Sequence, residues 1–190
     1  LSSNCLSTCS CELDAAQVLE FGANQVAIAT GAHWRKDGYG SAHQFPIPGA
    51  DGANVLTPDD VMDGVVPNGP VVVYDDEHYY MGAVVAENLR GDGLEVVLVT
   101  TDSKVSSWTD ATLEQHRIQA RIIELGIEIV TNHKLDKVNS GTIELSCLYS
   151  GQTRSINAAS IVMVTSRVPD DALFHALMAE EQKFADAGLQ

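Results

Sequence analysis

The hydrophobic pattern is strongest in the middle of the chain, where short apolar runs alternate with longer segments of helical periodicity. Residues 71–75 and 95–100 are nearly continuous runs of valine and leucine, which are typical of strands buried on both faces. Between them, residues 80–91 repeat apolar positions at a helical spacing. A second helical segment, 112–125, is stopped by a glycine and followed by an apolar run at 127–130. This order predicts a βαβαβ unit with a parallel sheet.

Three short alternating runs follow, separated by Ser-Gly pairs, at residues 134–138, 141–149 and 152–157. Such runs predict an antiparallel meander. A buried run at 160–165 then predicts one more strand. The order βαβαβ, meander, strand is that of the NADPH domain of glutathione-reductase-type flavoproteins. We therefore predict an α/β fold with a Rossmann-like parallel sheet and a β-meander.

Weaker patterns flank this unit. Asp14 and Thr57 are N-cap residues that predict a short helix at 14–21 and a second one beginning with Pro58. The other expected elements are a buried strand at 25–29, a linker-like segment rich in glycine and proline at 33–56, and a last helix at about 170–184.

The turn after residues 71–75 carries a degenerate dinucleotide-binding fingerprint. The three glycine positions of G-x-G-x-x-G fall on Glu77, Tyr79 and Gly82, so one glycine remains. The missing glycines would form the tight turn and let the backbone approach the pyrophosphate, which Tyr79 prevents sterically. The second strand also ends in Thr100 and Thr101, without the acid that would bind a ribose hydroxyl. We therefore predict that this domain does not bind NAD(P)H.

The acids Asp75, Asp76 and Glu77 have two interpretations. They are candidate acid–base or cation-binding carboxylates, but their position before a helix favours capping, and their charge repels phosphate. His78 is expected to be a surface side chain. Tyr79 and the following Tyr80 are expected to fill the vacated cofactor groove, with partner docking as the alternative.

The composition narrows the classes of partner. The chain has 190 residues, 11 Lys and Arg against 26 Asp and Glu, and a formal net charge of −15, which excludes nucleic acid and anionic membrane surfaces as favourable partners. No apolar run is long enough for a membrane span, and a cytoplasmic location is expected. On the helix at 112–125, Arg117 and Arg121 are one turn apart and are expected to form surface ion pairs.

Cys5, Cys9 and Cys11 form a C-x3-C-x-C pattern that invites an iron–sulfur or zinc interpretation. The fourth cysteine, Cys147, lies far along the chain, and such sites usually need four ligands at informative spacings. We therefore predict no metal site, and we identify no catalytic residue in this chain.

Four segments together resemble the trimethylamine, dimethylamine and histamine dehydrogenase group of iron–sulfur flavoproteins, relatives of old yellow enzyme. They are Val26–Gly38, Leu56–Gly64, Tyr74–Gly82, and Val105–Thr109 with Thr112–Gln119. The resemblance implies a C-terminal fragment with three parts. Residues 1–48 match part of a FAD/ADP-binding-like domain, 50–166 a degenerate NAD(P)-binding-like domain, and 167–190 a return segment.

The resemblance also implies what lies outside this chain. The parent would be an oxidoreductase acting on amines, with FMN and a 4Fe-4S cluster in an N-terminal flavin barrel and an electron-transfer flavoprotein as partner. An ADP site in the FAD-like half would border Thr30, Gly31 and Ala32. Two alternatives remain: a fragment of an NAD(P)H-dependent flavin oxidoreductase, and a free-standing ADP-binding or interaction module.

Overall fold

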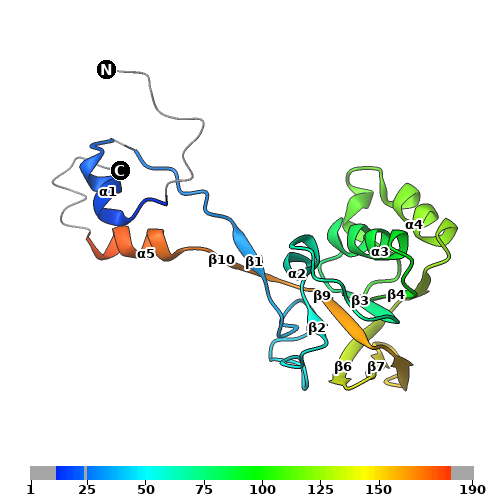
Figure 1. The fold of residues 1–190 in the computed structure, drawn as a ribbon. Helices are drawn as coiled ribbons and strands as arrows, with labels where there is room; N and C mark the ends of the chain where they lie inside the picture. The colour runs from blue at the N-terminus through cyan, green and yellow to red at the C-terminus, as the bar shows by residue number, and fades with distance from the viewer. Residues whose placement is uncertain (1–11, 24, 181–190) are drawn as a thin grey trace. The chain divides into compact units, whose positions relative to one another are not determined.

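The computed structural model of the protein describes residues 12–23 and 25–180 (Figure 1). The chain divides into two compact units. Unit 1 combines residues 1–32 with residues 169–190, and unit 2 consists of residues 33–168.

A five-stranded parallel sheet forms the centre of unit 2. Its strand order is β2 (Val55–Leu56), β9 (Ser160–Val164), β3 (Val71–Asp75), β4 (Val96–Thr100) and β5 (Glu128–Val130). Every residue of β3, β4 and β9 is buried, which explains why these strands are continuous apolar runs rather than alternating ones. The predicted parallel sheet is confirmed.

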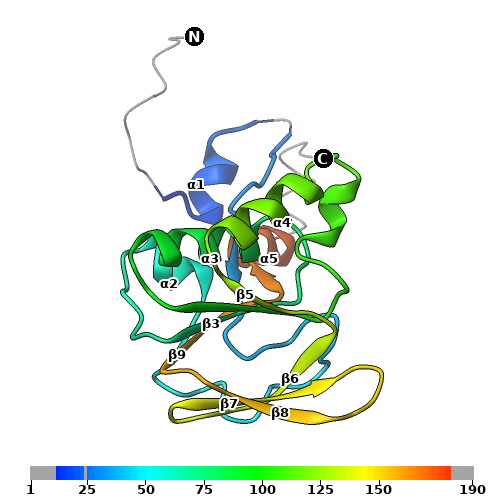
Figure 2. The same ribbon diagram turned by 90° about the vertical axis from the view of Figure 1, so that its right-hand side faces the viewer.

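Helices cover one face of this sheet and a second sheet covers the other (Figure 2). The helical face carries α2 (Pro58–Met62), α3 (Met81–Gly91) and α4 (Gln115–Glu124). The other face packs on the predicted meander, an antiparallel sheet of β6 (His133–Asn139), β7 (Thr142–Cys147) and β8 (Thr153–Asn157). Alternate residues of β3 point to the two faces, so Val73 joins the helical core and Tyr74 joins the core under the meander.

The order of the strands creates a switch point beside β3. The chain runs from β3 through α3, β4 and α4 to β5, and then returns through the meander to β9 on the opposite side of β3. In open α/β sheets, ligands bind beyond the carboxyl ends of the strands at such a point. The short 3₁₀ helix η1 (Ser107–Asp110) follows β4, and α4 starts after it, so the helix predicted at 112–125 begins three residues later.

Unit 1 contains α1 (Ala15–Glu20) and α5 (Ala172–Ala179). Asp14 caps α1 as predicted, in a capping box in which its side chain accepts from the Gln17 amide at 2.8 Å. The strand predicted at 25–29 is wrong, because this segment has no hydrogen-bonded neighbouring strand among the described residues and none of its side chains is buried. Two short strands that the sequence did not predict, β1 (Ala32–Trp34) and β10 (Arg167–Pro169), pair with each other where the chain passes between the units.

Candidate functional site

Polar side chains meet at the carboxyl ends of the central strands of unit 2. Asp75 ends β3, Thr100 ends β4 and Thr165 follows β9, and all three are buried. The turn of residues 76–80 connects β3 to α3 here, in the place where a dinucleotide-binding domain holds the pyrophosphate.

Asp75 binds the backbone of this turn. Its Oδ1 accepts hydrogen bonds from the amides of Glu77 at 3.2 Å and His78 at 3.0 Å. Its carboxylate also lies against the surviving fingerprint glycine, since a Cβ on Gly82 would come within 2.5 Å of the Asp75 Cγ. Burial raises the pKa of Asp75 to about 6, against the lowering effects of the His78 amide and the charge of the His78 ring. An internal carboxylate therefore occupies the donors that a bound phosphate would need.

Asp76 and His78 form a second buried group beside it. Asp76 Oδ1 accepts from the Thr101 hydroxyl at 2.8 Å and lies 3.6 Å from His78 Nε2. The ring of His78 also contacts the hydroxyl groups of Thr100 at 3.3 Å and Thr101 at 3.1 Å. Burial opposes both charges, but their proximity lowers the pKa of Asp76 and raises the pKa of His78, which favours a charged pair.

The prediction of His78 as a surface side chain is therefore wrong. The residue is 7% exposed and adopts φ +64°, a conformation in which histidine is over-represented among residues other than glycine. Thr100 and Thr101 stand at the end of β4, where a dinucleotide-binding strand would carry an acid, and they are the sequence signal that could have indicated the partners of His78.

Part of the segment expected to be linker-like packs over this end of the sheet. The Ala42 amide donates to Asp76 Oδ2 at 2.9 Å. Gly40 lies so close that an added Cβ would be 2.4 Å from the same oxygen and 3.3 Å from the Thr165 Cβ. The ring of His43 packs against Tyr74, with centroids 6.4 Å apart. Residues 40–43 thus cover the carboxyl edge where a ligand of an open sheet would enter.

Glu77, at the first glycine position, has a structural partner. Its Oε1 accepts from Arg167 Nη2 at 2.6 Å. The guanidinium carbon of Arg167 lies 4.2 Å from the centroid of the Trp34 ring, in cation–π geometry. The acid that replaces glycine therefore connects the turn to β10 and, through Arg167, to β1.

The expectation that Tyr79 and Tyr80 fill the groove is wrong. Tyr79 is 36% exposed, and the two rings form an edge-to-face pair with centroids 4.2 Å apart. The Tyr80 hydroxyl hydrogen-bonds the side chains of Thr112, at 3.1 Å, and Glu114. The interior of the turn is filled by Asp75 and His78 instead, because they satisfy the buried amides and hydroxyl groups there.

The prediction that Asp75, Asp76 and Glu77 cap the helix is wrong. The helix α3 begins after Tyr80 without a side-chain cap. Asp75 instead accepts hydrogen bonds from two backbone amides of the turn.

The proposed adenine-nucleotide residues lie in and beside unit 1. The Thr30 hydroxyl donates to the Asp170 carbonyl, the Gly31 carbonyl accepts from the Asp170 amide at 3.0 Å, and Ala32 begins β1. Gly31 has φ +87°, which favours glycine. These contacts fix the crossing of two chain segments, and a nucleotide site here stays a prediction.

The remaining candidate residues are not grouped into a site in the described part of the chain. Within residues 12–23 and 25–180, no three His, Cys, Asp or Glu side chains are grouped to hold a metal ion. Cys5, Cys9 and Cys11 lie outside the described residues. Every helix in the described part of the chain is too short or too polar to cross a lipid bilayer. Arg121 forms the expected surface ion pair, with Glu87 at 2.8 Å.

Comparison with known proteins gives relatives of much greater length. The chain is 30% identical to dimethylamine dehydrogenase of Hyphomicrobium sp. (strain x) over 198 aligned residues, 93% of this chain and 27% of the relative. Histamine dehydrogenase from Rhizobium sp. 4-9 has a similar fold, with a TM-score of 0.88 and 44% identity over 94% of this chain and 28% of that one. The 6-hydroxypseudooxynicotine amine oxidase from Pseudomonas geniculata N1 also has a similar fold, with a TM-score of 0.88. Its sequence is 39% identical over 95% of this chain and 27% of that one.

The chain thus spans just over a quarter of the length of these relatives. The predicted resemblance to the dimethylamine and histamine dehydrogenases is confirmed. Residues 56–167, which include the whole parallel sheet apart from Val55, match the family described as the OYE-like second alpha/beta domain. Because this match covers more than half of the 190 residues, the chain belongs to the OYE-like second alpha/beta domain family.

Proposed function

We propose that this chain is a C-terminal part of an amine dehydrogenase-like iron–sulfur flavoprotein oxidoreductase, and that it serves there as a non-catalytic structural and docking domain that does not bind NAD(P)H. The observation that carries this proposal is the pair of hydrogen bonds from the Glu77 and His78 amides to Asp75. A dinucleotide would have to displace a carboxylate from these donors and place phosphate charge beside it.

The same proposal assigns the parts of the chain and its parent. Residues 50–166 are a degenerate NADPH-type domain of the glutathione-reductase class, and residues 1–48 and 167–190 belong to a FAD-like domain with an ADP site near Thr30–Ala32. The parent supplies an N-terminal flavin barrel with FMN and a 4Fe-4S cluster, and it passes electrons to an electron-transfer flavoprotein. The identities of 30–44% to amine-oxidising proteins over 93–95% of this chain support this assignment.

Isothermal titration calorimetry of the 190-residue chain with NADH, NADPH and ADP tests the proposal. We expect NADH and NADPH to bind with a dissociation constant larger than about 100 µM, which corresponds to a binding free energy of less than about 5.5 kcal/mol in magnitude. The double variant Glu77→Gly, Tyr79→Gly should bind no better, because Asp75 still occupies the turn amides.

The ADP titration is the control for the two halves of the chain. Equal affinities for ADP and NADH would assign the signal to an adenine site near Thr30–Ala32. Binding of NADH tighter than about 100 µM without binding of ADP would instead refute the proposal and favour an NAD(P)H-dependent parent.

A further inference from the structure

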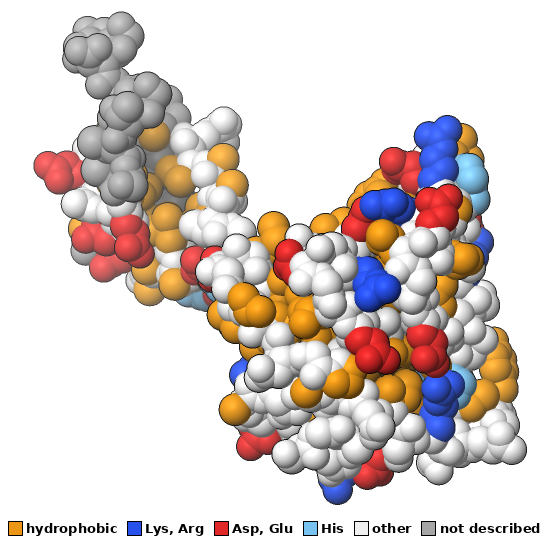
Figure 3. All heavy atoms as spheres, turned by 45° about the vertical axis from the view of Figure 1, so that its right-hand side comes forward, with side chains coloured by type: hydrophobic (Ala, Val, Ile, Leu, Met, Phe, Trp, Pro, Cys, Tyr) orange, Lys and Arg blue, Asp and Glu red, His pale blue; other side chains and the backbone are white. Residues whose placement is uncertain are grey.

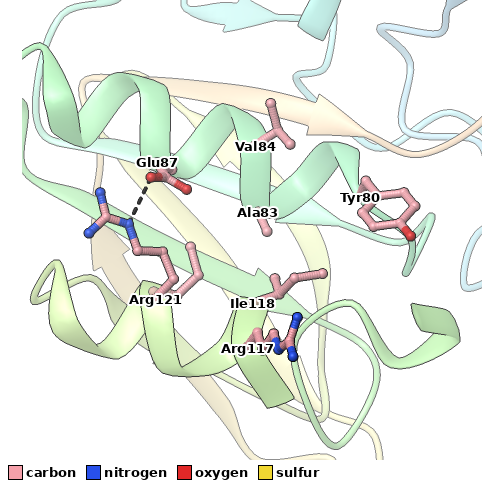
Figure 4. Close-up of a pocket in the computed structure, with 8 residues that line it drawn as sticks. Tyr80, Ala83, Val84, Glu87, Arg117, Ile118 and Arg121 are labelled. Carbon is pink, nitrogen blue, oxygen red and sulfur yellow. Dashed lines mark hydrogen bonds and ion pairs between the residues drawn. The ribbon is translucent and has the colours of Figure 1, made fainter. Parts of the chain in front are cut away.

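A surface groove lies between α3 and α4, and its Tyr80 end adjoins the turn of residues 76–80. It has a volume of about 220 Å³ and a largely apolar lining. Figure 4 shows Ala83 and Ile118 facing each other across the space between the helices, with Tyr80 near one end and the Glu87–Arg121 ion pair at the other. Its lining residues are Tyr80, Ala83, Val84, Glu87, Arg117, Ile118, Arg121 and Ile122.

Hydrogen bonds between side chains hold both ends of the groove. At one end the Tyr80 hydroxyl bonds Thr112 and Glu114, and at the other Arg121 Nε donates to Glu87 at 2.8 Å. Val84 on the groove wall is 50% exposed. An apolar depression with walls already held in place loses little conformational entropy when a ligand enters it.

Arg117 lines the groove, and its charge interacts with the neighbouring Glu114 carboxylate. Unlike Arg121, it has no carboxylate within ion-pair distance among the described residues. Basic side chains are scarce in this chain, which has 26 acidic and 11 basic residues. Figure 3 shows the same scarcity on one face of the molecule, where the few basic side chains lie among acidic and apolar ones. A guanidinium that has no carboxylate within 4 Å and lies beside an apolar groove is complementary to a carboxylate beside an apolar side chain.

Leu113 is an exposed apolar residue close in sequence to the groove residue Arg117. It is 80% exposed and adopts φ +62°, a conformation that is unfavourable for leucine. It lies between Thr112 and Glu114, the two residues that bind the Tyr80 hydroxyl. A strained backbone that presents a large apolar side chain to solvent is a feature associated with binding surfaces.

We propose that this groove docks a separate protein partner through one apolar side chain and a neighbouring carboxylate, which Arg117 binds. The volume is below the 300–1,000 Å³ typical of small-molecule pockets and suits a single side chain of a segment laid between two helices. A second copy of this chain is disfavoured, because two molecules of charge −15 repel each other. This inference places the docking role of the proposed function in the groove between α3 and α4. Its biological meaning rests on that proposed function, whereas the binding of a peptide by the groove does not.

Selection of 12-residue peptides displayed on phage, with the immobilised 190-residue chain as bait, tests this inference. We expect the selected peptides to carry Asp or Glu within about one helical turn of Leu, Ile, Met or Phe. Synthetic fluorescein-labelled copies should lose at least tenfold in affinity for Arg117→Glu and for Val84→Asp, measured by fluorescence anisotropy. The matched control Arg154→Glu makes the same charge change on β8, beyond the other face of the sheet, and should bind normally.

Four results would overturn the inference. The first is that no peptide is enriched, and the second is that the enriched peptides bind Arg117→Glu as well as the wild type. The third is a concentration-dependent dimer in sedimentation that Arg117→Glu abolishes. The fourth is that benzoate, in place of the peptides, binds in an Arg117-dependent way. Circular dichroism of each variant separates loss of binding from loss of fold. The NADH titration is independent of Arg117, so failure of one proposal leaves the other standing.

Discussion

The carboxylate of Asp75 packs directly on Gly82, so closely that a methyl group at position 82 would lie 2.5 Å from the Asp75 Cγ and 2.7 Å from its Cβ. The last glycine of the fingerprint thus persists because a carboxylate at the end of β3 needs the space at the start of α3. The same glycine in a cofactor-binding domain permits close packing of helix and strand. The packing of Asp75 therefore requires a glycine at position 82 whether or not a nucleotide is bound.

We expect Gly82→Ala to destabilise the protein by about 1–3 kcal/mol, because the added methyl group overpacks Asp75. Gly91→Ala is the matched control, since a Cβ on this last residue of α3 meets no atom within 4 Å. It should be neutral or stabilise by up to about 1 kcal/mol. Urea denaturation followed by circular dichroism measures both, and equal effects of the two variants would refute the packing argument.

Asp75→Asn should change how stability depends on pH. Its raised pKa means that the folded protein holds this proton more tightly than the unfolded chain does, so the contribution of Asp75 to stability is present below about pH 4 and is lost as pH rises through 6. Asparagine keeps an acceptor for the two turn amides and does not ionise. The rise from 3.8 to about 6 corresponds to at most about 3 kcal/mol.

The measurement is the free energy of unfolding of both proteins at pH 4, 5, 6 and 7. The wild type should lose stability relative to Asp75→Asn across this range, whereas the exposed control Asp51→Asn should show no such trend. A difference between wild type and Asp75→Asn that is independent of pH would contradict the prediction.

Thr101→Val removes a donor from a buried carboxylate while preserving side-chain shape. The Thr101 hydroxyl donates to Asp76 at 2.8 Å and lies 3.1 Å from His78 Nε2, so its loss should cost about 1–3 kcal/mol. Thr153→Val makes the same change at an exposed position on β8 and should have little effect. Thermal and urea unfolding compare the two, and a neutral Thr101→Val would show that this network contributes little.

Arg167→Ala should uncover the face of Trp34 and break the ion pair with Glu77. Since cation–π contacts and exposed ion pairs each contribute about 0.5–1 kcal/mol, the expected loss is about 1–2 kcal/mol. In a Trp108→Phe background Trp34 is the only tryptophan, and iodide should quench its fluorescence more strongly in Arg167→Ala. Arg154→Ala, which breaks the Glu128 pair instead, should leave quenching unchanged.

The strands and helices of the βαβαβ unit and the meander strands were predictable because their residues contact near neighbours in sequence or lie in fully buried runs. β3 begins and ends where the apolar pattern predicts, and the meander strands differ by a few residues. The failures concern contacts between distant residues. The bond from Ala42 to Asp76 and the pair of Arg167 with Glu77 join segments whose local composition carries no sign of each other.

His78 illustrates the same limit at a single residue. Its neighbours in sequence are acids and tyrosines, which suggest exposure, and only the arrival of Thr100 and Thr101 from the next strand makes a buried imidazole favourable. The sequence could predict that the turn does not bind phosphate, but it could not predict which side chains lie inside the turn.

The pairing of β1 with β10 has a consequence for the order of folding. The two segments of unit 1 are separated by all of residues 33–168, so in an unfolded chain they are joined by a long flexible tether. When unit 2 folds, its two ends meet at this strand pair. The two segments of unit 1 are then already close together, so unit 1 loses less loop-closure entropy when it forms. We therefore expect unit 2 to fold before unit 1, and we expect unfolding of unit 2 to destabilise unit 1, because the two segments of unit 1 then lose their proximity.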